Sequence, residues 1–269
     1  MKRDVWLAAH PYLKPVADLH ALVDAIAAEI SIPAAPIPKF DEYMVDYQAG
    51  IPLLESERVP CDSFPPDEIL DSFLTKLRTS NLPAILAEEC SGLQAELQHN
   101  RNSPIQSLAA RLETDSPATS YPGLLRYLGW TVLAIHLRSV VNAFGTWREE
   151  DGWLRNYCPT CGSPPTMAHL VATSDGRARH LLCGCCHTFW RYRRRGCPFC
   201  EDADDRRLAV ISFEGECGLR IDCCQACGGY LKTYSGDNEE LLADWTSLHL
   251  DVVARDRGLR RRAASLYEI

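Results

Sequence analysis

Four Cys-x-x-Cys pairs, all between residues 158 and 227, constrain this chain more than any other feature of its sequence. Each pair forms a tight turn that directs two thiolates to one point, and two such turns complete a tetrahedral four-sulfur site. Intervals of 21, 10 and 23 residues separate successive pairs, which groups the first with the second and the third with the fourth. The sequence therefore predicts two metal sites. Their ligands are Cys158, Cys161, Cys183 and Cys186 in the first site, and Cys197, Cys200, Cys224 and Cys227 in the second.

Two other interpretations of the pairs remain open at this stage. In one, the short middle interval joins the second pair to the third, and the first pair joins the fourth. In the other, a pair is a thioredoxin-like redox motif, which opens a helix after a strand, whereas short β-like runs follow these pairs. A site closed by four protein ligands leaves no position for water or substrate, so catalytic metal chemistry is not expected. Zinc and iron both accept four thiolates, and the spacing does not distinguish them.

Three further cysteines, Cys185, Cys217 and Cys223, fall outside the four pairs. We expect them to be buried small side chains or bystander thiols, because free cysteine packs as a small hydrophobic residue. Cys185 and Cys223 adjoin assigned pairs and could exchange into the sites. His187, which follows Cys186, is expected beside the site or at the surface rather than as a ligand.

The first half of the chain differs from the cysteine-rich half in charge and in periodicity. Residues 1–150 contain 12 Lys/Arg and 20 Asp/Glu, whereas residues 151–269 contain 16 of each. Apolar residues recur at helical spacing, and 46% of the chain is hydrophobic, which is enough for a real core. Helices are predicted over residues 19–30, 69–77, 83–98, 105–112 and 123–144. We find no metal-binding sequence pattern in this half.

Short β-like runs alternate with the cysteine pairs from residue 157 to residue 234. They cover residues 168–173, 179–182, 188–193, 208–213 and 219–222. Helical spacing returns over residues 239–258, where we expect a closing helix that packs back on the protein.

The predicted fold class is α+β with several domains: an N-terminal all-α helical bundle, two tandem zinc-ribbon-like metal-binding β units and a C-terminal helix. The predicted boundaries are 1–150 for the helical domain, 151–192 for the first unit, 193–236 for the second, and 237–269 for the helix and tail. Because each β unit is short, its folding should depend on its ion. We therefore expect loss of metal to unfold the β units while the helical half survives.

Charge and apolar patterning exclude several classes of protein. The arginines at positions 191, 193, 194 and 195 are expected to offset part of the negative charge of the two sites. Their alternative role, binding a nucleic-acid backbone, is disfavoured because the run is short and the formal net charge of the chain is −8. Polar residues interrupt both the N-terminal segment and the apolar run over residues 124–141, so neither a signal peptide nor membrane insertion is expected. We predict that the protein is cytoplasmic. Because the cytosol is reducing, its paired cysteines are expected to be metal ligands rather than disulfides.

An ordered series of motifs runs through residues 157–262. It begins with Cys158-Pro-Thr-Cys161-Gly-Ser-x-Pro, Arg179-His-Leu-Leu-Cys183 and Cys186-His-Thr-x-Trp190. It continues with Arg195-Gly-Cys197 through Cys200, with Cys224 to Cys227 followed by Gly-Gly-Tyr230-Leu-Lys232-Thr, and with Asp251-Val-Val-Ala254, Gly258 and Arg261. This series resembles the formate dehydrogenase accessory protein (FdhE) family. The first half is similar only in being a helical region of suitable size.

The resemblance implies a cytoplasmic assembly factor for respiratory formate dehydrogenases that depend on molybdenum or tungsten. It implies that the partner is the formate dehydrogenase catalytic subunit and that the protein is not an enzyme. It also implies that the two β units are rubredoxin-like and hold iron, with zinc as the alternative. Two alternatives to an assembly factor remain open. The chain could be a tandem zinc-ribbon protein that binds nucleic acid, or a rubredoxin-type electron carrier.

A partner could bind where the two halves of the chain meet. Aromatic and arginine side chains, which are common binding anchors, gather at residues 147–157. They are Trp147, Arg148, Trp153, Arg155 and Tyr157. The alternative is that these aromatic side chains join the two halves to each other.

Overall fold

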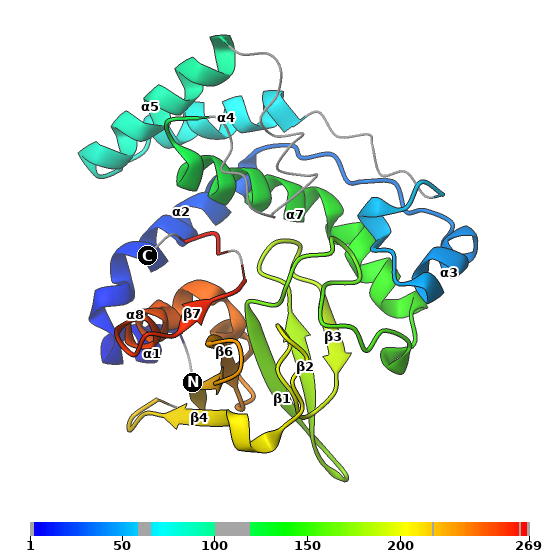
Figure 1. Ribbon diagram of the computed structural model, residues 1–269. Helices are drawn as coiled ribbons and strands as arrows, with labels where there is room; N and C mark the ends of the chain where they lie inside the picture. The colour runs from blue at the N-terminus through cyan, green and yellow to red at the C-terminus, as the bar shows by residue number, and fades with distance from the viewer. Residues whose placement is uncertain (1–2, 59–65, 100–118, 217, 264, 268–269) are drawn as a thin grey trace.

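The first half of the protein is helical, as predicted. The computed structural model describes residues 3–58, 66–99, 119–216, 218–263 and 265–267. The helices of this half are α1 (Arg3–Ala9), α2 (Lys14–Glu29), α3 (Phe40–Ala49), α4 (Pro66–Arg78), α5 (Ala84–His99) and α7 (Pro122–Trp147) (Figure 1). Four of the five predicted helices are confirmed, and the one over residues 105–112 lies outside the described residues. Helices α1 and α3 were not predicted from the sequence.

Helix α7 is the centre of the helical region and has Pro122 in its first turn, where a missing N–H costs nothing. Its N-terminal half packs Leu125 and Leu128 with α2, α4 and α5, and its C-terminal half packs Leu137 and Phe144 against α3 and the first β unit. By length and composition α7 could cross a membrane, contrary to our expectation for this run. In the protein, however, 61% of its most apolar window is buried, as in a core helix.

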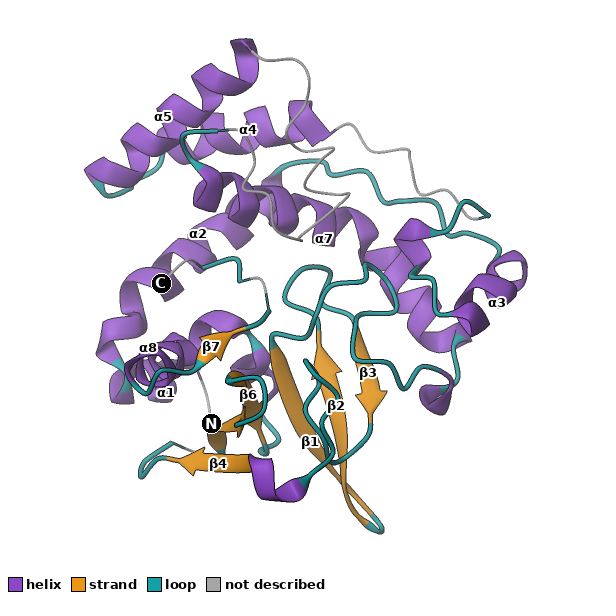
Figure 2. Ribbon diagram, in the orientation of Figure 1, coloured by secondary structure: helices purple, strands orange, loops and turns teal. Residues whose placement is uncertain are grey.

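The cysteine-rich half forms one sheet rather than two separate ones (Figure 2). The strands are β1 (Met167–Thr173), β2 (Gly176–Leu182), β3 (Phe189–Tyr192), β4 (Leu208–Ser212), β5 (Leu219–Cys224), β6 (Gly229–Tyr234) and β7 (Arg260–Arg261). Their order is β3-β2-β1-β6-β5-β4, with β7 paired to β6. Each predicted unit contributes three antiparallel strands, and the parallel pairing of β1 with β6 joins the two units.

Strand β6 lies in the middle of the sheet and was not predicted. All six of its residues are buried, including Lys232 and Thr233. A lysine at a fully buried position has no apolar signature, and it is tolerated here because Asp244 and Asp251 pair with it. The polar sequence therefore concealed the strand that connects the two units.

The C-terminal segment is only partly the closing helix that was predicted. Residues Glu239–Leu242 and Asp244–Ser247 form two 3-10 turns, and the helix α8 covers only Leu248–Asp256. The Thr246 hydroxyl donates to the carbonyls of Leu241 and Ala243, and Asp244 points inward to Lys232. These tertiary contacts favour the turns over a continuous helix.

Two hydrophobic clusters cross the predicted boundary between the helical and β parts. In one, Tyr43 and Phe144 of the helices pack with Cys158, Leu181 and Trp190 of the first unit. In the other, residues of α1 and α2 pack with β5, β6 and α8, and include Trp6, Ala17, Ile221, Tyr230 and Leu250. The helical half therefore shares its core with the β units, so metal loss should reach beyond the β units, contrary to the expectation above.

Candidate metal centres

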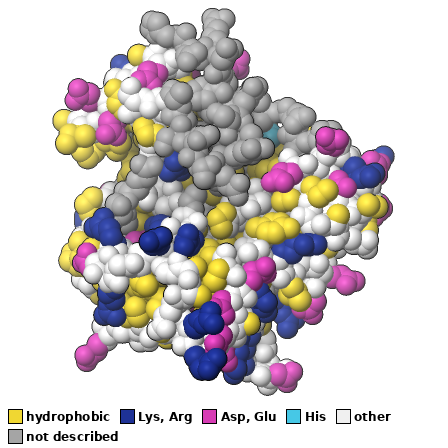
Figure 3. Space-filling model, viewed as in Figure 1, with side chains coloured by type: hydrophobic (Ala, Val, Ile, Leu, Met, Phe, Trp, Pro, Cys, Tyr) yellow, Lys and Arg dark blue, Asp and Glu magenta, His cyan; other side chains and the backbone are white. Residues whose placement is uncertain are grey.

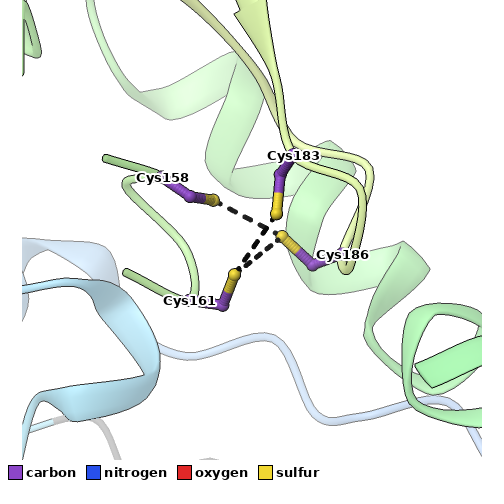
Figure 4. Close-up of side chains that lie close together, drawn as sticks. All are labelled: Cys158, Cys161, Cys183 and Cys186. Carbon is purple, nitrogen blue, oxygen red and sulfur yellow. Dashed lines mark hydrogen bonds between the residues drawn. The ribbon is translucent and has the colours of Figure 1, made fainter. Parts of the chain in front are cut away.

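The structure brings the eight paired cysteines together in the two predicted groups of four. In the first group the two loops before β1 and after β2 face each other, and their four sulfurs point toward a common centre (Figure 4). The Sγ–Sγ distances are 3.5 Å from Cys158 to Cys186, 3.4 Å from Cys161 to Cys183 and 3.6 Å from Cys161 to Cys186. A tetrahedral ion with metal–sulfur bonds of about 2.3 Å requires sulfur separations of roughly 3.8 Å. The first group is close to that geometry.

The second group has the same arrangement in a more open position. Its Sγ–Sγ distances are 3.7 Å from Cys197 to Cys227 and 3.7 Å from Cys200 to Cys224. These separations are far longer than the roughly 2.05 Å of a disulfide, and all four cysteines are free. Cys200 is exposed, whereas three of the four cysteines in the first group are buried. The first group is therefore part of the core, and the second lies at the surface.

The same turn recurs at all four pairs. At the three pairs that begin with Cys158, Cys183 and Cys197, the backbone N–H two residues later donates to the sulfur of that first cysteine, at 3.4 Å each. At the fourth pair, the N–H of Gly229 donates to the second cysteine, Cys227, at 3.3 Å. Such bonds favour the thiolate form, because they place partial positive charge beside it.

The residue after each pair has a left-handed backbone. The φ angles are 77° at Gly162 and 68° at Gly228, which suits a tight turn because glycine adopts this conformation without strain. His187 and Glu201 occupy the equivalent places with φ of 59° each, and neither was recognised from the sequence. Side chains other than glycine are strained in this region by roughly 1–2 kcal/mol.

We expect Gly228→Ala to destabilise the protein by about 1 kcal/mol and Glu201→Gly to be neutral or stabilising. No atom lies within 4 Å of a β-carbon built on Gly228, so the cost there comes from the backbone alone. Glu201 loses only an ion pair with Arg193, in which both side chains are at least 41% exposed. Urea denaturation of the metal-loaded variants measures both effects. Equal destabilisation by the two changes would contradict the proposed backbone strain.

A bound cation would hold all of the first group as thiolates. Burial raises the pKa of the Cys158 and Cys183 thiols well above the usual value, because a buried thiolate loses its hydration. At Cys186, in contrast, burial is outweighed by hydrogen bonds from the other three cysteines, which lower its pKa. In the second group burial raises the pKa of Cys197 to about 12. A bound divalent ion reverses this effect, since coordinating thiols are deprotonated. Both groups of four cysteines could thus hold a metal ion, and the identity of the metal is open.

The other cysteines that the structure describes are not members of either group. Cys185 is buried and donates its backbone N–H to Cys183, while the half-buried Cys223 donates its thiol to the carbonyl of Ala209. Cys217 lies outside the described residues. His187 is exposed beside the first group and is not one of its four members.

The arginines between the two groups pair with carboxylates rather than with the cysteine groups. Ion pairs of 2.6–3.1 Å connect Arg191 to Asp151, Arg193 to Glu201 and Arg195 to Asp205. On the face drawn in Figure 3, basic and acidic side chains are interspersed. These contacts offset the arginine charge locally, which weakens the case for a nucleic-acid interface.

Comparison with known proteins shows which proteins this chain resembles. The family model described as "FdhE, central domain" matches residues 157–194, which contain the first cysteine group. An FdhE homolog of Aquifex aeolicus is 33% identical over 115 residues, 41% of this chain. The FdhE protein of Salmonella paratyphi A is 27% identical over 219 residues, 79% of this chain and 68% of that protein. The chain is therefore similar to FdhE proteins, both in its cysteine-rich half and over most of its length.

Two further comparisons define how far the FdhE likeness extends. The alignments span only 41% of the length of the Aquifex aeolicus relative and 64% of the Stutzerimonas stutzeri FdhE homolog. The crystal structure of the FdhE protein from Pseudomonas aeruginosa has the same fold, with a TM-score of 0.60 and 22% identity over 95% of this chain and 88% of that one.

A cleft of about 660 Å³ lies between the loops that carry the two cysteine groups. Asn156, Tyr157, Phe199, Cys200 and Arg262 are among its lining residues. Of the aromatic and arginine side chains predicted to form a binding groove at the junction, only Tyr157 lines this cleft. Trp153 is completely buried, stacks on Tyr47 and has the Arg155 guanidinium 5.5 Å from its ring, so it joins the two halves.

Proposed function

We propose that this chain is an accessory factor in the maturation of respiratory formate dehydrogenase, and that it binds the catalytic subunit of that enzyme in the cytoplasm. Similarity to FdhE proteins supports the proposal, together with the two four-cysteine groups. In this role the chain acts by binding its partner, and it is not an enzyme.

We further propose that each cysteine group holds one ion through its four sulfurs. The sulfur separations fit a tetrahedral ion, and the N–H donors around the sulfurs favour thiolates. The family resemblance favours iron, and zinc is the alternative. Iron supplies a one-electron couple when bound, whereas zinc supplies none. Ferric iron would make the protein red through thiolate charge transfer, and zinc would leave it colourless.

We propose that the partner binds in the cleft between the two cysteine groups. Cys200 and Cys227 of the second group contribute to it, and so do Gly162 and Pro164, which follow the first cysteine pair. A partner segment in the cleft would contact the second metal centre and lie beside the loop that carries Cys158 and Cys161. Interfaces place aromatic and arginine side chains at their centres, and Phe199 and Arg262 supply both here.

Asn156→Arg places a long charged side chain in the cleft and should weaken binding of the catalytic subunit at least about tenfold. The measurement is recovery of formate dehydrogenase on the tagged protein, purified anaerobically with both ions retained. Val5→Arg is the matched control, because Val5 is 56% exposed on α1 and does not line the cleft. Equal recovery by both variants would contradict the cleft. Failure of the unmodified protein to recover any formate dehydrogenase subunit would contradict the function.

Electron transfer is a second candidate function, and the exposure of Cys200 favours it. An ion held partly by an exposed sulfur can exchange electrons with a docked partner, while the first group is enclosed by the core. This role is compatible with an accessory function. A reversible one-electron couple, lost in Cys200→Ser, would support it.

A further inference from the structure

A third cluster of metal-ligating side chains lies away from both cysteine groups. His10 follows α1, Glu216 lies in the turn between β4 and β5, and His249 is in the first turn of α8. The Glu216 Oε1 atom is 3.1 Å from His10 Nε2 and 2.9 Å from His249 Nε2. The three side chains are only 7%, 11% and 15% exposed, respectively. The cluster is therefore nearly closed to solvent.

The hydrogen bonds around His10 leave two acceptor atoms facing each other, with no donor or positive charge between them. Its Nδ1 is 3.0 Å from the Trp6 carbonyl, which can only accept, so Nδ1 carries the proton of a neutral ring. The Nε2 lone pair of that neutral ring then faces the carboxylate of Glu216, which is also an acceptor. Glu216 Oε2 and His249 Nδ1 are buried without hydrogen-bond partners. Two acceptors pointing at each other in a nearly closed site need a positive charge between them, either a metal ion or a second proton on the imidazole.

We propose that His10, Glu216 and His249 bind a divalent transition-metal ion. Imidazole and carboxylate ligands suit ions such as zinc, cobalt and nickel. The three ligand atoms lie within 4.8 Å of one another. Metal–ligand bonds of about 2.1 Å that meet at right angles place neighbouring ligands roughly 3.0 Å apart, close to the two distances observed.

The surroundings hold these ligands in place. Trp6 stacks on the His10 ring with centroids 3.7 Å apart, and the edge of Tyr12 packs on both imidazoles. The ligands come from segments separated by 206 and 33 residues. The ion would therefore tie the N-terminal segment and α8 to the second β unit. Three protein ligands also leave a coordination position open, unlike the cysteine groups.

Cobalt titration of the full chain, with zinc already in the cysteine groups, tests the site. We expect one Co²⁺ per chain, with weak visible absorption and without the intense near-ultraviolet bands of cobalt bound to thiolates. His249→Gln and Glu216→Gln should each weaken this binding at least about tenfold. Cobalt should also raise the unfolding midpoint of the unchanged protein, but not that of the two variants.

His180→Gln is the matched control, because His180 also contacts a glutamate, Glu150, but without a second histidine. It should bind cobalt as the unchanged protein does. The proposal is overturned if the unchanged chain binds no cobalt below about 1 mM. It is equally overturned if His249→Gln and Glu216→Gln, folded with both zinc ions, bind cobalt as tightly as the control. In those cases a proton on His10 supplies the missing charge.

Discussion

Cys183→Ser is expected to remove one metal ion and to lower the unfolding midpoint by about 10 °C or more. Structural metal sites contribute many kcal/mol to folding, and each kcal/mol shifts the midpoint of a chain this size by roughly 2–4 °C. Cys183 is buried in the same hydrophobic cluster as Tyr43 and Phe144 of the helices. The loss should therefore spread into the helical half, with the helical and β signals melting together in circular dichroism and tryptophan fluorescence.

Two variants serve as controls for this prediction. Cys185→Ser makes the same chemical change two residues away, in a buried cysteine outside the four-cysteine group, and should keep both ions. Cys200→Ser should lose the other ion with a smaller drop in midpoint, because Cys200 is exposed. A helical signal that survives unchanged in Cys183→Ser would contradict the shared core.

Lys232→Met is expected to destabilise the protein by about 3–5 kcal/mol, because it leaves buried carboxylates short of a partner. Lys232 is 1% exposed and pairs with Asp244 and, at 2.7 Å, with Asp251. Arg261 also bonds both carboxylates, at 2.7 Å and 3.0 Å. This network joins β6 to the C-terminal turns, to α8 and to β7. Denaturant unfolding of the metal-loaded protein measures the change in the free energy of unfolding.

Lys76→Met is the matched control, since it breaks an ion pair with Glu29 whose side chains are 40% and 64% exposed. It should cost less than about 1 kcal/mol. Equal effects of the two changes would contradict the importance of the buried network.

The same network makes stability sensitive to acid. Burial alone would raise the pKa of Asp244, but Lys232 and Arg261 outweigh it and lower the pKa to about 2. A carboxyl whose pKa is lowered by folding stabilises the protein above its unfolded pKa, so this contribution is lost as the pH falls from about 4 to about 2. In Lys232→Met the acid-dependent loss should be smaller.

Much of this arrangement could be read from local sequence patterns. Periodic apolar residues predicted α2, α4, α5 and α7, because each helix buries one face. The spacing of the cysteine pairs predicted the two groups, because a short loop brings two thiolates together whatever the rest of the chain does.

The missing features depend on contacts between distant residues. Strand β6 was concealed because Lys232 is buried only through partners 12 and 19 residues away. The segment over residues 239–247 has helical spacing, yet it forms turns because Asp244 reaches into that network. His10 lies in a half without any metal-binding pattern, and its two companions follow about 200 residues later. Local sequence patterns do not predict such contacts between distant residues.

The eight cysteines are expected to form two four-sulfur metal centres. X-ray absorption together with metal analysis tests this most directly, on anaerobically purified His249→Gln protein, so that only the cysteine groups hold metal. We expect two ions per chain, each surrounded by four sulfurs at about 2.3 Å. A single ion per chain, or nitrogen or oxygen atoms among the nearest neighbours of the metal, would contradict it.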